Sequence, residues 1–526
     1  MFEVHQPFRL NRNFHSDLLA KGKVTRKEDL FDLYFDNSLN RYVFERAARK
    51  CYFPANKIIL EQIEQSKKEG KPFKVTYGIS GVFLEQCELW KPGLTESFRQ
   101  LAETGCVEFM DETYYHSLAS LYGTDRTEFM EQVEMHRQLM KELFNVEPQT
   151  VENTELLYNN DIAKTMEAMG YMGTVTEGIE RILSWRSPNY VYKAKDSNLR
   201  VLLRNYRLSD DIGFRFSSNW WNEYPLNATK YASWLASAQG QVITLFIDYE
   251  TFGEHHWPES GIHEFLRALP HEVNRWHHLN WRTPSEVIKL HEPVGEIDVH
   301  EYNTVSWADI ERDTSAWIGN PMQNICYDSL KELEQLVKGI GDKKLIRLWR
   351  YLQLSDHLYY ISIKGGGPGD VHNYFSSMGS PVEAFAVCSR ILSDLEARIR
   401  MELEKPELAA KRLLRRVPAG RGFTFSYEFA RSSSVTVHSL NEFVSALKTV
   451  DISSICFHME KGDFERWLRY VVGDDKLADQ IAKIKVTKKL EGEALRKKIL
   501  SVAKQRIKQL NKIADGASTS LKETQN

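Results

Sequence analysis

Acidic residues that directly follow short apolar runs are the groups in this sequence best suited to acid–base chemistry. Residues 242–247 are almost continuously apolar, and Asp248 and Glu250 come immediately after them. Because strand side chains alternate, we expect Asp248 and Glu250 to point to the same side. Crowding raises the pKa of one carboxyl group, which keeps a general acid protonated at neutral pH. For this pair alone, capping of the next helix is the favoured interpretation.

A second carboxylate occupies a similar position. Glu155 follows a short predicted strand at residues 149–153. One acid together with one nucleophile or base is what glycoside hydrolysis requires. Capping of a helix start explains Glu155 equally well from spacing alone. The two positions support each other, because each places a carboxylate where a barrel carries its active site.

Histidines lie near these carboxylates in the sequence. Pro7 ends the first predicted strand, which puts His5 at the same edge, although a lone histidine is more often structural. His255 and His256, with His263 and the neighbouring glutamates, suggest a metal site. Their spacing matches no zinc signature, so we expect histidines that bind a sugar through hydrogen bonds. We predict no metal and no cofactor.

Other kinds of site lack support in the sequence. Residues 365–369 are rich in glycine, but they follow a helical stretch and lack the Gly-Lys-Ser/Thr ending of a phosphate loop. The sequence contains no Gly-x-Ser-x-Gly elbow and no cysteine in a catalytic Cys/His signature. A nucleophilic serine or cysteine is therefore not expected.

The elements that must position these residues alternate between short apolar runs and helical patterns up to about residue 290. Continuous apolar runs between helices are typical of parallel strands buried on both faces. We predict a (β/α)7-type barrel with its active residues at the carboxyl ends of the strands. The predicted strands after the first are at residues 73–79, 107–110, 149–153, 174–176 and 242–247.

Changes in periodicity and composition divide the chain into four predicted parts. Residues 1–285 form the catalytic barrel, and residues 286–410 form a helical domain that completes the active site, with helices around 330–337, 345–354 and 382–401. Residues 422–475 form a small α+β accessory domain. Residues 476–526 form a basic amphipathic helix and a disordered end.

Composition describes a globular protein with an uneven charge. Of the 526 residues, 42% are hydrophobic and 27% charged, which excludes a disordered chain. Residues 476–513 carry a net charge of +9, so the net of −3 leaves residues 1–475 acidic, which argues against nucleic-acid binding. We expect the tail to be a solvated or oligomerising helix, and a homo-oligomer is possible. Scattered cysteines and no long apolar span indicate a cytoplasmic protein without membrane contact.

Five sequence blocks in order resemble glycoside hydrolase family 57, in particular its archaeal α-amylase branch. The blocks are His-Gln-Pro at 5–7, Gly-Cys-Val-Glu at 105–108, Asn-Thr-Glu-Leu at 153–156, Asp-Tyr-Glu-Thr-Phe-Gly-Glu-His at 248–255 and Ser-Asp-His-Leu-Tyr-Tyr at 355–360. The resemblance covers residues 1–400 and implies a retaining mechanism on α-glucans such as starch, glycogen or maltooligosaccharides. Residues 423–477 resemble a small domain that recurs beside carbohydrate-active enzymes.

The resemblance also implies roles for individual residues. It makes Glu155 the nucleophile and Asp248 the general acid/base. Its substrate-binding positions correspond to His5, Glu108, Glu250, His255 and Asp356. Trp257 and Trp317 are candidate sugar platforms, for which core packing is at least as good an explanation. Glu3 departs from the family, which usually has a second histidine there, so its role is left open.

Three alternatives to hydrolysis remain from the sequence. A sugar hydroxyl in place of water would make the same site a 4-α-glucanotransferase. A non-catalytic glucan-binding protein on the same fold is disfavoured, because both Glu155 and Asp248 are present. A metal-dependent polysaccharide deacetylase on a similar barrel is the weakest alternative.

Overall fold

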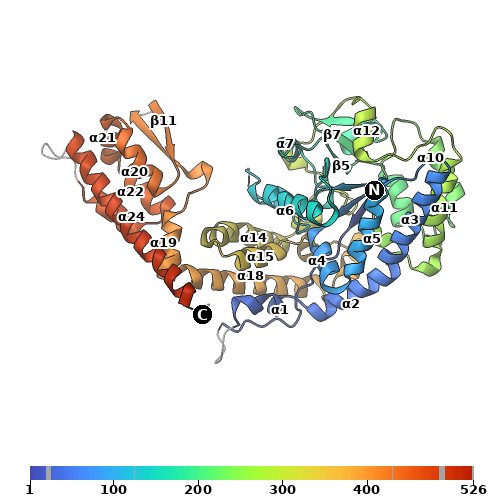
Figure 1. Ribbon diagram of the computed structural model, residues 1–526, viewed down its shortest axis with the longest axis horizontal. Coiled ribbons are helices and arrows are strands. Elements are labelled where there is room, and N and C mark those ends of the chain that lie inside the picture. Colours follow the sequence, from blue (N-terminus) through green and yellow to red (C-terminus); the bar gives the residue numbers. More distant parts are fainter. Residues whose placement is uncertain (19–24, 124, 429–430, 485–491, 524–526) are drawn as a thin grey trace. The chain divides into compact units, whose positions relative to one another are not determined.

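The computed structural model of the chain describes residues 1–18, 25–123, 125–428, 431–484 and 492–523. The chain forms two compact units (Figure 1). The N-terminal unit comprises Met1–Lys331 and Arg347–Leu392, and the C-terminal unit comprises Glu332–Ile346 and Ser393–Asn526.

One parallel sheet of the N-terminal unit carries most of the predicted site. Its strand order is β3-β2-β1-β8, and the strands are β1 (Phe2–Val4), β2 (Val75–Ile79), β3 (Val107–Met110) and β8 (Ile247–Asp248). Glu3 of β1 lies level with Gly78 of β2 and with Asp248 of β8. This register brings the carboxyl ends of three strands together at one edge.

A second sheet has the order β4-β5-β7-β6-β9. Its strands are β4 (Thr150–Glu152), β5 (Gly173–Glu177), β6 (Tyr192–Ala194), β7 (Arg200–Arg204) and β9 (Glu296–Ile297). β4, β5 and β7 run parallel, whereas β6 is antiparallel to β7. Parallel bridges from Asp111 to Val151 and from Arg204 to Thr244 connect this sheet to the first one.

Helices cover the first sheet and build the largest core. The helices α3 (Phe53–Lys68), α5 (Pro92–Glu103) and α11 (Ile262–Asn274) lie beside these strands in Figure 1. Ile59, Phe98 and Phe265 contribute to one apolar cluster with Tyr77 and Tyr249 from the strand side. All five residues of β2 are buried and none is charged, as expected for a parallel strand covered on both faces.

The predicted α/β class with parallel strands is confirmed. The strands β2, β3, β4 and β5 fall at the predicted positions, but most of residues 242–247 is not a strand. Only β8 and the bridge at Thr244 represent that run. The strand β7 was not predicted, because two arginines bracket its three apolar residues.

Helices follow the second sheet, as the periodicity predicts. They include α14 (Pro321–Ile340), α15 (Lys343–Tyr351) and α18 (Pro381–Leu403). The helix α17 (Gly366–Phe375) begins within the glycine-rich stretch. The short helix α16 (Ser355–Tyr359) carries Asp356, and it belongs to the same compact unit as the sheets.

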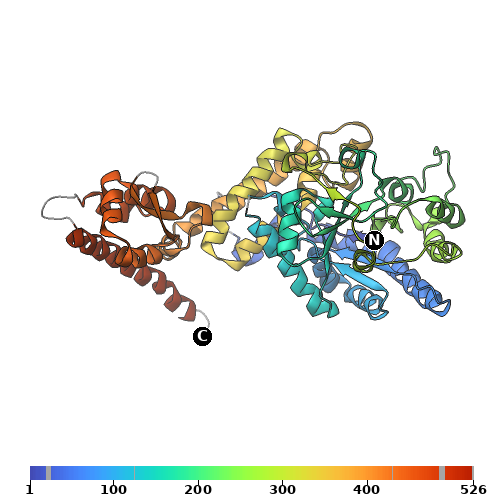
Figure 2. The ribbon, with the colours of Figure 1, turned by 90° about the horizontal axis from the view of Figure 1, so that it is seen from above.

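The C-terminal unit has its own core. The hairpin of β10 (Phe423–Glu428) and β11 (Arg431–Val437) packs with α20 (Leu440–Thr449) and α24 (Gly492–Glu523). Figure 2 shows α24 running along this unit. Leu495 and Ile499 of α24 are buried in the same cluster as Phe443. The basic segment, predicted as a separate tail, therefore completes this core with its apolar stripe, and its helix continues beyond the predicted disordered start at residue 514.

Within the described residues, no helix is both long enough and apolar enough to cross a membrane.

We expect Gly78→Ala to destabilise the N-terminal unit, because a Cβ there would lie 1.4 Å from Oε1 of the buried Glu152. Overpacking of this kind costs about 1–3 kcal/mol, measurable as a lower urea midpoint. Gly93→Ala is the matched control, since nothing lies within 4 Å of its Cβ position. The control should be neutral or slightly stabilising. An unchanged midpoint for Gly78→Ala would contradict the close approach of Glu152.

Candidate active site

The candidate active site lies at the carboxyl ends of the parallel strands. His5 follows β1 directly after Val4, and Asp248 ends β8. Glu155 follows β4 within a short 3-10 helix (Thr154–Leu156). Parallel strands place their carboxyl ends at one edge, so residues more than 200 positions apart in the sequence meet there.

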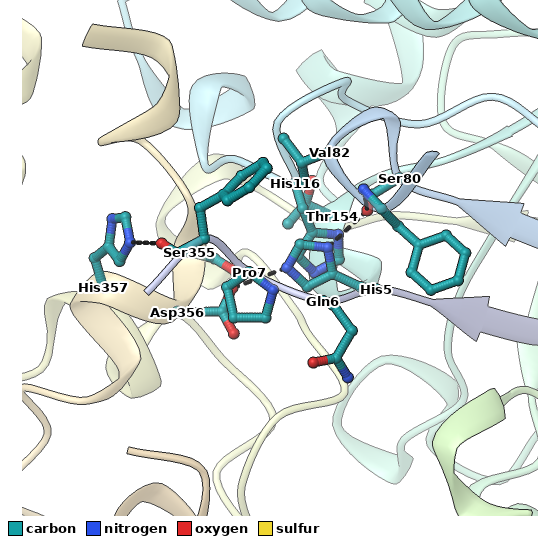
Figure 3. Close-up of polar contacts among 12 residues, drawn as sticks. His5, Gln6, Pro7, Ser80, Val82, His116, Thr154, Ser355, Asp356 and His357 are labelled. Carbon is teal, nitrogen blue, oxygen red and sulfur yellow. Dashed lines mark hydrogen bonds and ion pairs between the residues drawn. The ribbon is translucent and has the colours of Figure 1, made fainter. Parts of the chain in front are cut away.

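His5 links this edge to the helical region. Its Nε2 lies 3.0 Å from Oδ2 of Asp356, and its Nδ1 lies 2.7 Å from Oγ of Ser80 (Figure 3). Burial lowers the pKa of His5, and we assign the neutral ring with the proton on Nε2, donating to Asp356. Burial alone would raise the pKa of Asp356, but its contact with His5, together with the charge of His116, holds that pKa below its ordinary value. The predicted contribution of α16 to the site is therefore a direct contact.

His116 stacks against His5 and faces several carboxylates. The two rings lie 4.0 Å apart between centroids and almost parallel. Its Nδ1 is 3.0 Å from Oε2 of Glu112, and its Nε2 is 3.5 Å from Oε1 of Glu155. Burial lowers the pKa of His116, but Glu112 and Glu155 outweigh it and raise that pKa well above its ordinary value. His116 is therefore a cation beside Glu155.

Both the side chain and the backbone carbonyl oxygen of Glu155 accept hydrogen bonds. The Trp307 indole Nε1–H donates to Oε2 of Glu155 over 2.6 Å, and the Ser355 hydroxyl donates to Oε1 over 3.5 Å. The Ser306 hydroxyl donates to the Glu155 carbonyl oxygen over 2.8 Å. Glu155 and Leu156 both have positive φ, of 58° and 54°. Such backbone is strained for residues with side chains and is concentrated at functional sites.

Asp248 is a carboxyl group whose proton is retained near neutral pH. Burial and the negative charge of Glu155 raise its pKa to about 7, although Arg204 and His116 oppose this shift. The Arg204 guanidinium is itself buried and pairs with Glu177 and Asp210. Its positive charge keeps the pKa of Asp248 from rising further.

Glu250 interacts with Asp248, and His255 follows Glu250 in the chain. The Tyr52 hydroxyl donates to Oε1 of Glu250 over 2.5 Å. Burial and the charge of Asp248 raise the pKa of Glu250 to about 8. Burial lowers the pKa of His255 to about 3, so its ring is neutral, and it contacts the ring of Phe375.

Four predicted binding residues do not join the group through any contact described, and His255 is one of them. Glu108 accepts hydrogen bonds from Thr150 and from the backbone and hydroxyl of Ser285, because it lies two residues before the end of β3. Trp317 is completely buried, so the prediction that it is a sugar platform is wrong. Trp257 is 58% exposed, and the Lys50 ammonium lies over its ring.

The sequence did not reveal several residues of the site. Trp307 lies in irregular chain between helices, and no motif marks it. Glu112 and His116 are four residues apart after β3, just beyond the block that drew attention to Glu108. Their spacing of carboxylate and imidazole was the one available signal.

The histidines first considered for a metal site are occupied in other ways. Nε2 of His256 and Nε2 of His263 each contact a backbone carbonyl oxygen, 3.0 Å away at Ile212 and 2.7 Å away at Phe252. Among the described residues, the group suited to a metal ion is instead Glu3, Glu112 and His116, whose ligand atoms lie within 4.8 Å of one another.

The arrangement suits acid-assisted substitution at a sugar carbon. It combines a carboxyl group that is protonated near neutral pH with a second carboxylate fixed by an indole N–H. A general acid and a nucleophile or base are the two groups that glycoside hydrolysis needs.

Comparison with known proteins agrees with this chemistry. Residues 1–300, more than half of the chain, match the model of "Glycosyl hydrolase family 57", and residues 460–520 match a "Family of unknown function (DUF5752)". A protein of Methanocaldococcus jannaschii named "Putative alpha-amylase" is 48% identical over 414 residues, which are 77% of this chain and 85% of that protein.

Solved structures support the fold. A GH57 branching enzyme of Thermococcus kodakaraensis superposes with a TM-score of 0.54 at 14% identity, covering 77% of this chain and 89% of that one. A GH57-type branching enzyme of Pyrococcus horikoshii gives 0.50 at 14% identity, covering 78% and 89%. Together with the match over residues 1–300, these findings identify the chain as a glycoside hydrolase of glycosyl hydrolase family 57.

Proposed function

We propose that this enzyme cleaves α-1,4-glucosidic bonds of an α-glucan with retention of configuration, using Glu155 as nucleophile and Asp248 as general acid/base. The observation that carries the proposal is the pairing of these two residues: burial and the charge of Glu155 raise the pKa of Asp248 to about 7. The family match and the name of the 48% identical relative support the substrate class.

In the first step, protonated Asp248 donates its proton to the glycosidic oxygen while Glu155 attacks the anomeric carbon. The bond from that carbon to the leaving oxygen breaks, and a glycosyl ester on Glu155 forms. The Trp307 N–H holds one oxygen of Glu155, which leaves Oε1 as the attacking atom. His116 stabilises the carboxylate before attack through its positive charge.

In the second step, Asp248 acts as the base. Its carboxylate accepts a proton from water as the water attacks the anomeric carbon and displaces Glu155. Two inversions leave the product in the α-configuration. We propose that His5, Asp356 and Glu250, which adjoin the pair, bind sugar hydroxyls, and that His255 does so as well.

We infer that the strands form a (β/α)7-type barrel around this site. The parallel order β3-β2-β1-β8 and the parallel strands β4, β5 and β7 supply seven strands. The bridges at Asp111 and Arg204 join the two sheets at both seams, which supports closure.

Transfer to a sugar hydroxyl remains the second candidate for the same site. The structural resemblance to branching enzymes favours a test of transfer, because their fold is shared at low identity. With maltoheptaose, hydrolysis raises the concentration of reducing ends, whereas transfer redistributes chain lengths without raising it. The alternative of a non-catalytic glucan-binding protein predicts neither change.

We expect Glu155→Ala and Asp248→Ala each to lower kcat/KM on maltoheptaose by about 10²–10⁴-fold, because each removes a group that acts at the reacting bond. Azide with an α-maltosyl fluoride substrate separates the roles. The Glu155 variant should yield the β-glycosyl azide, and the Asp248 variant the α-glycosyl azide. Reversed products would exchange the two assignments, and full activity of either variant would refute its role.

Activity should fall as the pH rises through about 7. Asp248 must be protonated to assist departure of the leaving group, and above its pKa the protonated fraction falls about tenfold per pH unit. The measurement is kcat/KM on maltoheptaose between about pH 5 and 9, because a sugar leaving group depends on protonation. Because the pKa of Glu250 is raised to about 8, Glu250→Gln is the control, and the limb near pH 7 should persist in it. A flat profile would remove Asp248 as the acid.

Trp307→Phe should lower kcat/KM about 10–100-fold, because a hydrogen bond to a charged group contributes about 1.5–3 kcal/mol. The phenyl ring keeps the contact with Phe246 and loses only the N–H to Glu155. Trp349→Phe is the matched control, since its buried Nε1–H donates to the Leu330 carbonyl oxygen, 2.8 Å away. Equal losses in both variants would indicate a general effect of altered packing.

A further inference from the structure

We propose that Glu3, Glu112 and His116 bind a divalent transition-metal ion in the interior of the N-terminal unit, beside the edge where the parallel strands end, with Glu152 as a fourth ligand. We call these four residues the acidic pocket. They come from three places in the sequence: Glu3 from β1, Glu112 and His116 from the chain after β3, and Glu152 from the end of β4.

The distances within the acidic pocket suit a metal ion. Nδ1 of His116 is 3.0 Å from Oε2 of Glu112 and 3.6 Å from Oε1 of Glu3. A tetrahedral ion with bonds of about 2.0–2.1 Å separates its ligand atoms by roughly 3.3 Å. The two distances bracket this value, so small shifts would bring all three atoms into coordination.

Unpartnered oxygens of buried glutamates point to a missing ligand. Both carboxylate oxygens of Glu152 lack a hydrogen-bond partner, and the residue is completely buried. Oε1 of Glu3 and Oε1 of Glu112 are also unpartnered, on residues that are 4% and 0% exposed. Buried polar atoms nearly always have a partner, and four orphaned oxygens in one place require one.

Full ionisation of the acidic pocket would need a cation besides His116. Three carboxylates face one imidazole, and no lysine or arginine among the described residues forms an ion pair with them. Burial and the neighbouring carboxylates raise the pKa of Glu3 and of Glu152 well above the ordinary range. The nearby amino group of Met1 compensates little at pH 7, because burial lowers its pKa to about 5.

A shared proton between Glu3 and Glu152 is the competing occupant, since their carboxyl groups interact. It does not satisfy the four unpartnered oxygens together, because one proton joins only two of them. A metal ion on Nδ1 of His116 would replace the proton that faces Glu112, so the ion would supply the positive charge while Nε2–H still faces Glu155. The ion would then sit one ring away from Glu155.

The donor set selects the class of ion. One imidazole nitrogen with carboxylate oxygens suits Zn²⁺ and similar transition metals, whereas Mg²⁺ and Ca²⁺ prefer oxygen alone. We therefore expect Zn²⁺ to bind more tightly than Mg²⁺ or Ca²⁺.

The test is Zn²⁺ binding by the tag-free full-length chain after treatment with a chelator. Calorimetric titration, with metal analysis after gel filtration, should give one Zn²⁺ per chain. Glu112→Gln and His116→Gln should weaken this binding by about 100-fold or more, because each removes a ligand. Because the measurement of Zn²⁺ binding needs no substrate, its result does not depend on the proposed glycosidase activity.

His136→Gln is the matched control. His136 is also a buried imidazole paired with a carboxylate, 2.7 Å from Oδ1 of Asp111, but its second nitrogen meets the Ile79 carbonyl oxygen and Oδ2 of Asp111 is bound by Tyr171. This variant should bind Zn²⁺ as the wild type does. If His116→Gln does not fold by circular dichroism, Glu3→Gln serves in its place.

Proton release provides a second measurement. Because the pocket holds protons in the absence of metal, Zn²⁺ should displace at least one near pH 7, measured by titration in buffers of different ionisation enthalpy. Failure of the wild type to bind Zn²⁺, or equal binding by wild type and the Glu112 and His116 variants, would overturn the proposal. Absence of binding would leave the shared proton as the occupant.

Discussion

Negative charge gathered in a buried place is the constraint on which this structure depends. Asp248, Glu155 and Glu3 meet where parallel strands end, and burial penalises the charged form of each carboxyl group that it encloses. Several nearby groups offset this cost of burying charge. Arg204 supplies positive charge, Trp307 donates a hydrogen bond, and the pKa of Asp248 rises to about 7, which keeps its proton.

The same constraint explains why the helical region belongs with the sheets. Asp356 on α16 reaches His5, and Ser355 beside it reaches Glu155. Both side chains extend a hydrogen-bond network that starts on β1 and β4. The site is thus assembled from distant segments, and its geometry depends on how α16 packs against the strand ends.

Much of the fold was predictable, because burial on both faces makes parallel strands continuously apolar. The strands β2, β3, β4 and β5 lie where the apolar runs predicted them. The strand β7 was not predicted, since arginines bracket its apolar centre. One of these arginines, Arg204, lowers the pKa of Asp248 through its positive charge. The acidic body and the basic C-terminal segment were visible as charge, but the sequence alone did not show that the apolar stripe of α24 completes the C-terminal core.

The sequence by itself predicted the pair Glu155 and Asp248, because each follows an apolar run and stands in a block of residues that resembles the family. It did not determine the partners of that pair. A periodic pattern reports which residues are buried, but it carries no information on which buried residues meet across strands. Only the tertiary structure shows that His116 lies between Glu112 and Glu155. It also shows that Glu108 contacts Ser285 and that Trp317 is buried. Those outcomes follow from strand register and helix packing, which depend on contacts between residues far apart in the chain.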